Sequence, residues 1–335
     1  MIDFDKGVKL PNKFYGSEKK TTIAYEGCVY MVKYPDPIRE NKRQAIISYK
    51  NNQFSEHIGS LIFKSCGMEA QETILGYITT PNNKRKIVVG CKDFTQEGGV
   101  LYEADKLANA IAPDEEQLRT RIEDVYRIFN ESSFIKDKDE IKNKFWDMFV
   151  IDALIANKDR HLGNWGIIIT NGVCKFSPVY DCGSSLSALT EDEEMKDLLN
   201  SDGLFKSLEF NEASVYSMNG VRIRYHEIFK TPPPELKEAI KRIVPKIDIG
   251  KIHDIIDAVE SMPEIRKEYL KKAVSLRYEQ ILYPALKRSL VMPTQQKTDL
   301  FGSNLLAEKK AQADALNAAR VVPVNSQGQT EEIEL

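Results

Sequence analysis

Two aspartates and an asparagine near the middle of the chain have the types and spacing for phosphoryl transfer. Asp159 and Asn164 have four residues between them, and Asp181 follows Asn164 by 17 positions. A kinase catalytic loop uses this spacing to place a carboxylate beside the acceptor hydroxyl and an amide oxygen on Mg²⁺. Phosphoryl transfer needs little more than a positioned acceptor and oxygen ligands for a hard cation. We therefore expect Asp159 to act on the acceptor, and Asn164 and Asp181 to be catalytic residues that hold Mg²⁺.

The sequence after Asn164 predicts a hairpin that brings Asp181 back to it. Strand-like runs within 165–176 lie on either side of Asn171-Gly172, a pair typical of a type I′ turn. An amphipathic helical pattern precedes the loop. Aspartate and asparagine are also ordinary loop and capping residues, so the alternative is a loop without catalytic function.

Upstream, Lys33 and Glu56 are candidates for a nucleotide-binding ion pair. Lys33 lies near the end of the second of two strand-like runs, 21–25 and 28–34, and Glu56 lies in the first turns of a helical pattern at 52–66. In kinases a strand lysine binds the α- and β-phosphates and a helix glutamate positions it. The alternative is an edge-strand lysine and a solvated helix charge.

A short turn-like segment before the first of these strands is a candidate phosphate loop. It consists of Gly16, Ser17, Glu18 and Lys19, whose backbone N–H groups are expected to cover the phosphates of ATP. The segment has one glycine and matches neither the Walker pattern nor the protein-kinase glycine-rich pattern. The alternative is a surface turn.

Together these segments resemble the HipA-like serine/threonine protein kinases over most of residues 10–285. Two runs resemble the family's catalytic and metal-binding segments: Ala156-Asn157-Lys158-Asp159-Arg160-His161-Leu162-Gly163-Asn164-Trp165 and Tyr180-Asp181-Cys182-Gly183. The segment Val32-Lys33-Tyr34-Pro35 is similar to the family's nucleotide-binding lysine segment. The candidate phosphate loop is also similar, with Gly16 one place closer to Glu18 than in the family pattern.

The resemblance implies an α+β, two-lobed protein-kinase-like fold. A small β-rich N-lobe is expected at 1–93 and a larger, mostly helical C-lobe at 94–291. A polar tail, at most one helix, is expected at 292–335 because its composition provides little core. The hinge between lobes would place the backbone of Lys92 and the side chain of Phe94 at the adenine.

The resemblance further implies ATP-dependent phosphorylation of serine or threonine on a protein substrate, with Mg²⁺ as cofactor and with autophosphorylation. Asn12 stands where the family has an autophosphorylated loop serine, although Ser17, Thr21 and Thr22 lie close. An antitoxin or host-protein partner is not identified by the sequence.

Two other functions stay open. Asp159-Arg160-His161 is also similar to phosphoinositide kinases, which makes a phosphoinositide-kinase-like effector an alternative. The sequence near the candidate site lacks the basic cluster expected for an anionic lipid surface. The other alternative is a nucleotide-binding interaction module without turnover, with its partner surface at 185–220 or in the tail.

Composition is that of a globular protein, with 335 residues, 42% hydrophobic and 29% charged, and a formal net charge of −3. The charge predicts no direct nucleic-acid binding.

Five scattered cysteines and four dispersed histidines predict neither disulfides nor a zinc site, and His161 is expected to hold the loop geometry. No signal peptide or membrane span is evident, so we expect synthesis in the cytoplasm, with export by a signal-less route left open. Residues 185–220 are expected to be rich in loops.

Overall fold

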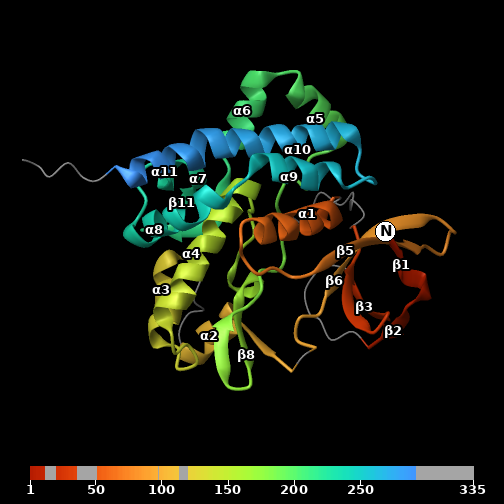
Figure 1. The fold of residues 1–335 in the computed structure, drawn as a ribbon, viewed down its shortest axis with the longest axis horizontal. Helices are drawn as coiled ribbons and strands as arrows, with labels where there is room; N and C mark the ends of the chain where they lie inside the picture. The colour runs from red at the N-terminus through yellow and green to blue at the C-terminus, as the bar shows by residue number, and fades with distance from the viewer. Residues whose placement is uncertain (12–19, 36–50, 97, 113–119, 292–335) are drawn as a thin grey trace, which may run out of the picture. The chain divides into compact units, whose positions relative to one another are not determined.

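A curled six-stranded sheet forms the N-terminal part of the protein (Figure 1). The computed structural model describes residues 1–11, 20–35, 51–96, 98–112 and 120–291. Gly16, Ser17, Glu18 and Lys19 of the candidate phosphate loop, Asn12, and the tail at 292–335 lie outside the described residues.

The strand order is β1-β5-β6-β4-β3-β2, antiparallel except for the parallel pair of β1 and β5. The strands are β1 Ile2–Asp3, β2 Val8–Leu10, β3 Lys20–Tyr25, β4 Cys28–Lys33, β5 Thr73–Thr79 and β6 Arg85–Lys92. The predicted pair of strands is confirmed. Because β4 lies between β6 and β3, Lys33 is on an interior strand, and its interpretation as an edge-strand lysine is wrong.

The helix α1, Asn52–Ser65, packs against β5 and β6 and confirms the predicted helix that carries Glu56. It ends where Cys66 caps it and Gly67 adopts a φ of +81°, a left-handed conformation that glycine takes without strain. The next residues lead directly into β5. The position of Glu56 is therefore fixed against the sheet that carries Lys33.

The remainder of the described chain is mostly helical, with two small sheets. The helices are α2 Ala104–Ile111, α3 Ile122–Glu131, α4 Lys138–Ile155, α5 Asp192–Leu199, α6 Asp202–Phe210, α7 Tyr225–Ile228, α8 Pro234–Ile243, α9 Ile249–Asp257, α10 Glu264–Arg277 and α11 Tyr283–Leu290. A π-helical turn, Tyr278–Leu282, joins α10 to α11, and short 3₁₀ turns lie at Phe4–Lys6, Leu162–Asn164 and Val244–Lys246. None of the described helices has the length and apolar character needed to cross a membrane.

The expectation that 185–220 is rich in loops is wrong. This stretch contains α5, α6 and the strand β10, Ala213–Met218, which pairs with β11, Val221–Arg224. The acidic residues that suggested a solvated loop instead lie in and around the first turn of α5, where carboxylates stabilise the helix N-terminus.

The predicted hairpin after Asn164 is confirmed. β8, Gly166–Thr170, pairs with β9, Val173–Phe176, and β7, Val100–Glu103, pairs with the other edge of β8. Asn171 and Gly172 have φ angles of 52° and 75°, as a type I′ turn requires.

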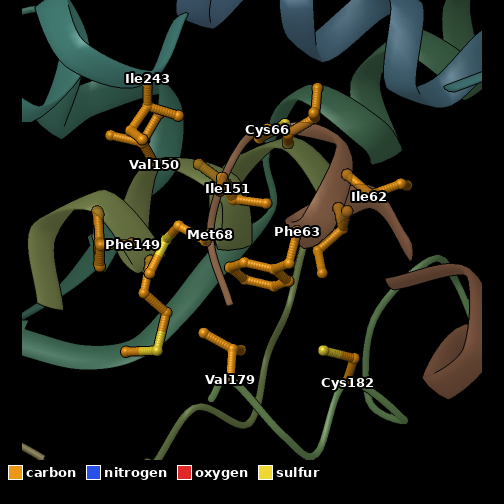
Figure 2. Packing of buried hydrophobic residues seen from close by; sticks show 14 of the residues in the cluster. Ile62, Phe63, Cys66, Met68, Phe149, Val150, Ile151, Val179, Cys182 and Ile243 are labelled. Carbon is orange, nitrogen blue, oxygen red and sulfur yellow. The ribbon is translucent and has the colours of Figure 1, made fainter. Parts of the chain in front are cut away.

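A continuous apolar core joins α1 to the helical region. Figure 2 shows Phe63 of α1 in the same packed layer as Ile151 of α4 and Val179 and Cys182 of the segment around Asp181. All four side chains are almost completely buried. The core therefore holds the segment that carries Asp181 against both α1 and α4.

A smaller apolar cluster on the sheet depends on the absence of two side chains. Phe4, 1% exposed, lies over Gly76 and Gly90. A Cβ atom on Gly76 would come within 2.6 Å of the Ile2 carbonyl oxygen and of the Phe4 ring.

Replacement of Gly76 by alanine should therefore destabilise the protein. We expect the free energy of unfolding to fall by about 1–3 kcal/mol, because the new methyl group overpacks a site lined partly by backbone. Thermal unfolding of Gly76→Ala beside Gly203→Ala tests this. Gly203 lies in α6, a Cβ there meets nothing within 4 Å, and alanine favours helix, so this variant should not be destabilised. Equal melting temperatures would contradict the packing argument.

Candidate active site

Three charged side chains from distant parts of the sequence meet at the centre of the site. The Lys33 Nζ atom lies 2.8 Å from the Glu56 Oε2 atom and 2.8 Å from the Asp181 Oδ1 atom. Lys33 and Glu56 are 4% and 1% exposed, whereas the Asp181 side chain is 33% exposed. The predicted pair is therefore confirmed as an ion pair, and the interpretation of Glu56 as a solvated charge is wrong. The structure adds Asp181 as a second partner of the lysine.

Glu56 also fixes the backbone next to Asp181. Its second carboxylate oxygen, Oε1, accepts a hydrogen bond of 3.1 Å from the backbone N–H of Cys182. Asp181 itself has a φ of +58°, which an aspartate adopts with some strain. Gly183 passes so close to Glu56 that a Cβ atom there would lie 3.2 Å from Oε2. The glutamate thus holds both the lysine and the turn that presents Asp181.

The catalytic-loop residues are linked to one another by hydrogen bonds. The Asn164 Nδ2 atom donates to the backbone oxygen of Asp159 at 2.7 Å. The backbone N–H of Asp159 donates to the Asn157 Oδ1 atom at 3.1 Å. Because the amide nitrogen of Asn164 is used within the loop, its Oδ1 atom is the part of the side chain left for a cation.

His161 has the structural role expected for it. Its Nδ1 atom accepts a 3.0 Å hydrogen bond from the backbone N–H of Gly163, and its side chain is exposed. This bond caps the 3₁₀ turn that begins at Leu162 and ends at Asn164.

Arg160 is a functional residue to which the sequence analysis assigned no role. The side chain is 1% exposed and makes a two-pronged ion pair with Asp152 of α4, at 3.0 and 3.1 Å. It also donates to the backbone oxygens of Asn164, at 2.8 Å, and of Tyr180, and to the Cys182 Sγ atom at 3.6 Å. One guanidinium group therefore connects α4, the catalytic loop and the residues on both sides of Asp181.

Asp152 completes this network on the other side. Its Oδ1 atom also accepts a 3.0 Å hydrogen bond from the Asn157 Nδ2 atom, and its backbone oxygen accepts from the backbone N–H of Asn157. Tyr225 in turn donates its hydroxyl to the backbone oxygen of Asn157 at 2.7 Å. The signal in the sequence was a lone aspartate within the apolar run Val150 to Ile155, since a buried charge requires a partner.

The two aspartates predicted to be catalytic, Asp159 and Asp181, have opposite pKa shifts. Burial is the largest effect and raises the pKa of Asp159; the nearby His161 lowers it by less, and the charge of Asp181 raises it again. For Asp181, burial acts in the same direction, but the charge of and hydrogen bond from Lys33 outweigh it and lower the pKa. Environments that separate two carboxyl pKa values separate their roles. A carboxylate with a lowered pKa stays charged and suits the predicted role of Asp181 as a ligand of a cation. A carboxyl group with a raised pKa suits the predicted role of Asp159 as a base that accepts a proton.

The residues predicted to form the hinge lie at the end of β6. The backbone N–H of Lys92 donates a 2.8 Å hydrogen bond to the backbone oxygen of Glu72. The Lys92 ammonium group forms a half-exposed ion pair with the Glu72 carboxylate at 2.9 Å. The Phe94 ring lies 5.9 Å from the ring of Tyr180. Phe94 therefore contacts the segment that leads into Asp181, and its predicted contact with adenine stays a prediction.

No group of three or more His, Cys, Asp or Glu side chains suited to a metal ion occurs among the described residues. Mg²⁺ is commonly held by one or two protein oxygens together with substrate phosphates and water. The oxygens of Asn164 and Asp181 fit that pattern.

Breaking the buried Arg160–Asp152 pair should be costly. In Asp152→Asn, the guanidinium group would stay buried without its counter-charge, so we expect a loss of about 3–5 kcal/mol in the free energy of unfolding. Urea unfolding measures this. Glu131→Gln is the matched control, because Glu131 forms an exposed pair with Arg127 and should cost under about 1 kcal/mol. Similar losses in the two variants would contradict the assigned role of the network.

Comparison with known proteins agrees with this geometry. Residues 14–248 match the family of the HipA-like C-terminal domain. The chain is 34% identical over 304 residues to the serine/threonine-protein kinase CtkA of Helicobacter pylori. The matched region covers 88% of this chain and 91% of that protein. The chain also resembles the crystal structure of the H. pylori proinflammatory kinase CtkA, with a TM-score of 0.77 and 32% sequence identity over 87% of this chain and 99% of that one. The α+β kinase-like fold is thereby confirmed, and the chain belongs to the HipA-like C-terminal domain family and is a kinase.

Proposed function

We propose that this kinase transfers the γ-phosphate of ATP to serine or threonine hydroxyls of a protein substrate. The observation that carries the proposal is the position of Lys33 between Glu56 and Asp181, beside a catalytic loop that Arg160 binds to the same segment. The similarity to a serine/threonine-protein kinase supports the choice of acceptor.

Each residue of the site has a distinct role in this proposal. Lys33, held by Glu56, binds the α- and β-phosphates of ATP. Asp159 orients the acceptor hydroxyl and takes its proton as the oxygen attacks, which its raised pKa favours. Asn164 and Asp181 hold Mg²⁺, which when bound neutralises charge on the phosphates.

The finer parts of the proposal concern domains and the nucleotide contacts. We place the N-lobe at 1–93 and the C-lobe at 94–291, with the hinge at Lys92 to Phe94. The tail at 292–335 is assigned to neither lobe. The loop at 16–19 would cover the phosphates.

Autophosphorylation is part of the proposal, and the structure limits its acceptors. Thr22 is 1% exposed on β3, so its hydroxyl cannot enter another active site without disruption of the sheet. Thr21 is partly exposed and accepts a 3.2 Å hydrogen bond from the Tyr34 hydroxyl. Of these two residues, Thr21 is the better candidate.

Labelled ATP and Mg²⁺ test the assignment of the catalytic residues. The wild type should incorporate phosphate as phosphoserine or phosphothreonine, located by mass spectrometry. We expect Asp159→Asn and Asp181→Asn to lower the rate by roughly 10²-fold or more, because each loses a group required in the transition state. Asp139→Asn, at a side chain that is 89% exposed, should keep the wild-type rate. Unchanged incorporation in both active-site variants would refute the assignment, and transfer to lipid vesicles alone would favour a lipid kinase.

The pH dependence of turnover should reflect the raised pKa of Asp159. A base with a raised pKa is protonated, and therefore inactive, at a higher pH than an ordinary aspartate. We expect kcat to fall with decreasing pH through a value above the ordinary 3.8. A profile of kcat from about pH 4 to pH 8 at saturating ATP and Mg²⁺ measures it. A kcat that stays constant down to about pH 4 would contradict the role of Asp159.

A further inference from the structure

The helix α6 presents an apolar face to solvent. It buries Phe205 and Glu209, but Leu204 and Leu208 are 64% and 41% exposed. The two leucines are four residues apart and therefore share one face of the helix. Leu189, before α5, is a third leucine with 41% exposure. A surface helix normally turns its apolar stripe inward, and gathered exposed apolar side chains are a common mark of a partner-binding surface.

The same stretch concentrates the negative charge of the protein. Residues 191–210 contain seven acidic and two basic residues, a formal charge of −5, but Asp192, Asp202 and Glu209 form ion pairs with Arg266, Lys272 and Arg277 of α10. With these three cations included, the stretch keeps a formal charge of −2. Glu193, Glu194 and Asp197 of α5 have exposed side chains. An apolar face close in sequence to exposed carboxylates favours partners that carry positive charge.

Hydrogen bonds connect α6 to the segment that follows Asp181. The Ser187 hydroxyl donates to the Glu209 Oε1 atom at 3.1 Å, and Glu209 forms a buried ion pair with Arg277 of α10. The backbone N–H of Leu186 donates to the Ile155 oxygen at 2.8 Å, which ties the same segment to the end of α4. A partner bound on α6 is thereby held at a fixed position relative to the catalytic loop.

We propose that α5 and α6 form a docking surface for a basic, amphipathic segment of the protein substrate. This inference rests on the proposed kinase function and adds a substrate class to it. Figure 1 draws α5 and α6 on the side of α10 opposite to α1 and the six-stranded sheet. The surface therefore binds a segment remote from the acceptor residue and raises the local concentration of that acceptor at the site. Its charge disfavours anionic lipid and nucleic acid as occupants.

The acids in the first turn of α5 have a second possible explanation, because carboxylates there stabilise the helix. Asp197 separates the two explanations. It lies in the last turn of α5, where a carboxylate is unfavourable and a lysine is favourable to the helix dipole. Asp197→Lys should therefore leave α5 intact and still weaken docking.

Binding is measured first, without ATP, by fluorescence anisotropy. The probes are a labelled lysine-rich amphipathic helical peptide with leucines along one face and the same peptide with glutamate in place of lysine. We expect the wild type to bind the basic peptide at least about tenfold more tightly than the acidic one. Asp197→Lys and the double variant Leu204→Ser with Leu208→Ser should each weaken binding of the basic peptide, by roughly tenfold.

Phosphate transfer is measured next, with a serine acceptor peptide alone and joined by a flexible linker to the basic peptide. The joined substrate should have a KM roughly tenfold lower than the acceptor alone, with kcat unchanged, and the two variants should abolish this difference. Transfer to the bare acceptor should be equal in all three proteins. If no protein transfers phosphate, the proposed function fails, while the anisotropy still reports whether the surface docks peptides.

Val221→Ser and Glu268→Lys are the matched controls. Val221 is 67% exposed on β11, and Glu268 is exposed on α10, so each repeats one type of change outside the proposed surface. Both should bind the basic peptide like the wild type. Equal affinity for the basic and acidic peptides, or equal loss in controls and variants, overturns the proposal. Self-association that is lost in Asp197→Lys, without peptide binding, would assign the surface to a second copy of the chain and also overturn it.

Discussion

The ion pair of Arg160 with Asp152 is the constraint on which the active site depends. A guanidinium group that is 1% exposed is stable only when its charge and its donors are matched. Asp152 supplies the opposite charge. The backbone oxygens of Asn164 and Tyr180 accept hydrogen bonds from the Arg160 Nη1 atom, which does not contact Asp152. Because these partners belong to α4, the catalytic loop and the segment before Asp181, the three can satisfy the arginine only in one arrangement. A buried ion pair of this kind specifies geometry more than it adds stability.

Lys33 plays the corresponding part on the side of the sheet. Lys33 forms an ion pair with Glu56. Glu56 also accepts a hydrogen bond from the backbone N–H of Cys182, the residue after Asp181. The N-terminal sheet and the helical region are therefore joined at the site through a lysine, a glutamate and an aspartate. The same lysine lowers the pKa of Asp181, whereas burial raises that of Asp159, and this separation is what the two proposed roles require. Preorganised charge of this type is the main contribution that a protein makes to phosphoryl transfer.

Local patterns were enough to predict much of the fold. The strands on either side of Glu26 and Gly27, the helix α1 and the hairpin at Asn171-Gly172 depend on periodicity and turn chemistry, which are properties of short segments. The prediction failed at 185–220, where a high content of polar and acidic residues was interpreted as loop. Acidic residues at a helix N-terminus and helices with one buried face, such as α5 with Met195, have the same composition.

The sequence by itself determined the identities and spacing of Asp159, Asn164 and Asp181, which are the residue types and the spacing of a kinase catalytic loop. Only the tertiary structure decided that Lys33 contacts Asp181, 148 positions away, and that Asp152 and Arg160 support the loop. Spacing in a sequence reports contacts within a helix, strand or turn, whereas contacts between segments depend on how the core packs. The exposure of Leu204 and Leu208 was decided in the same way, since only packing determines which face of a helix is buried.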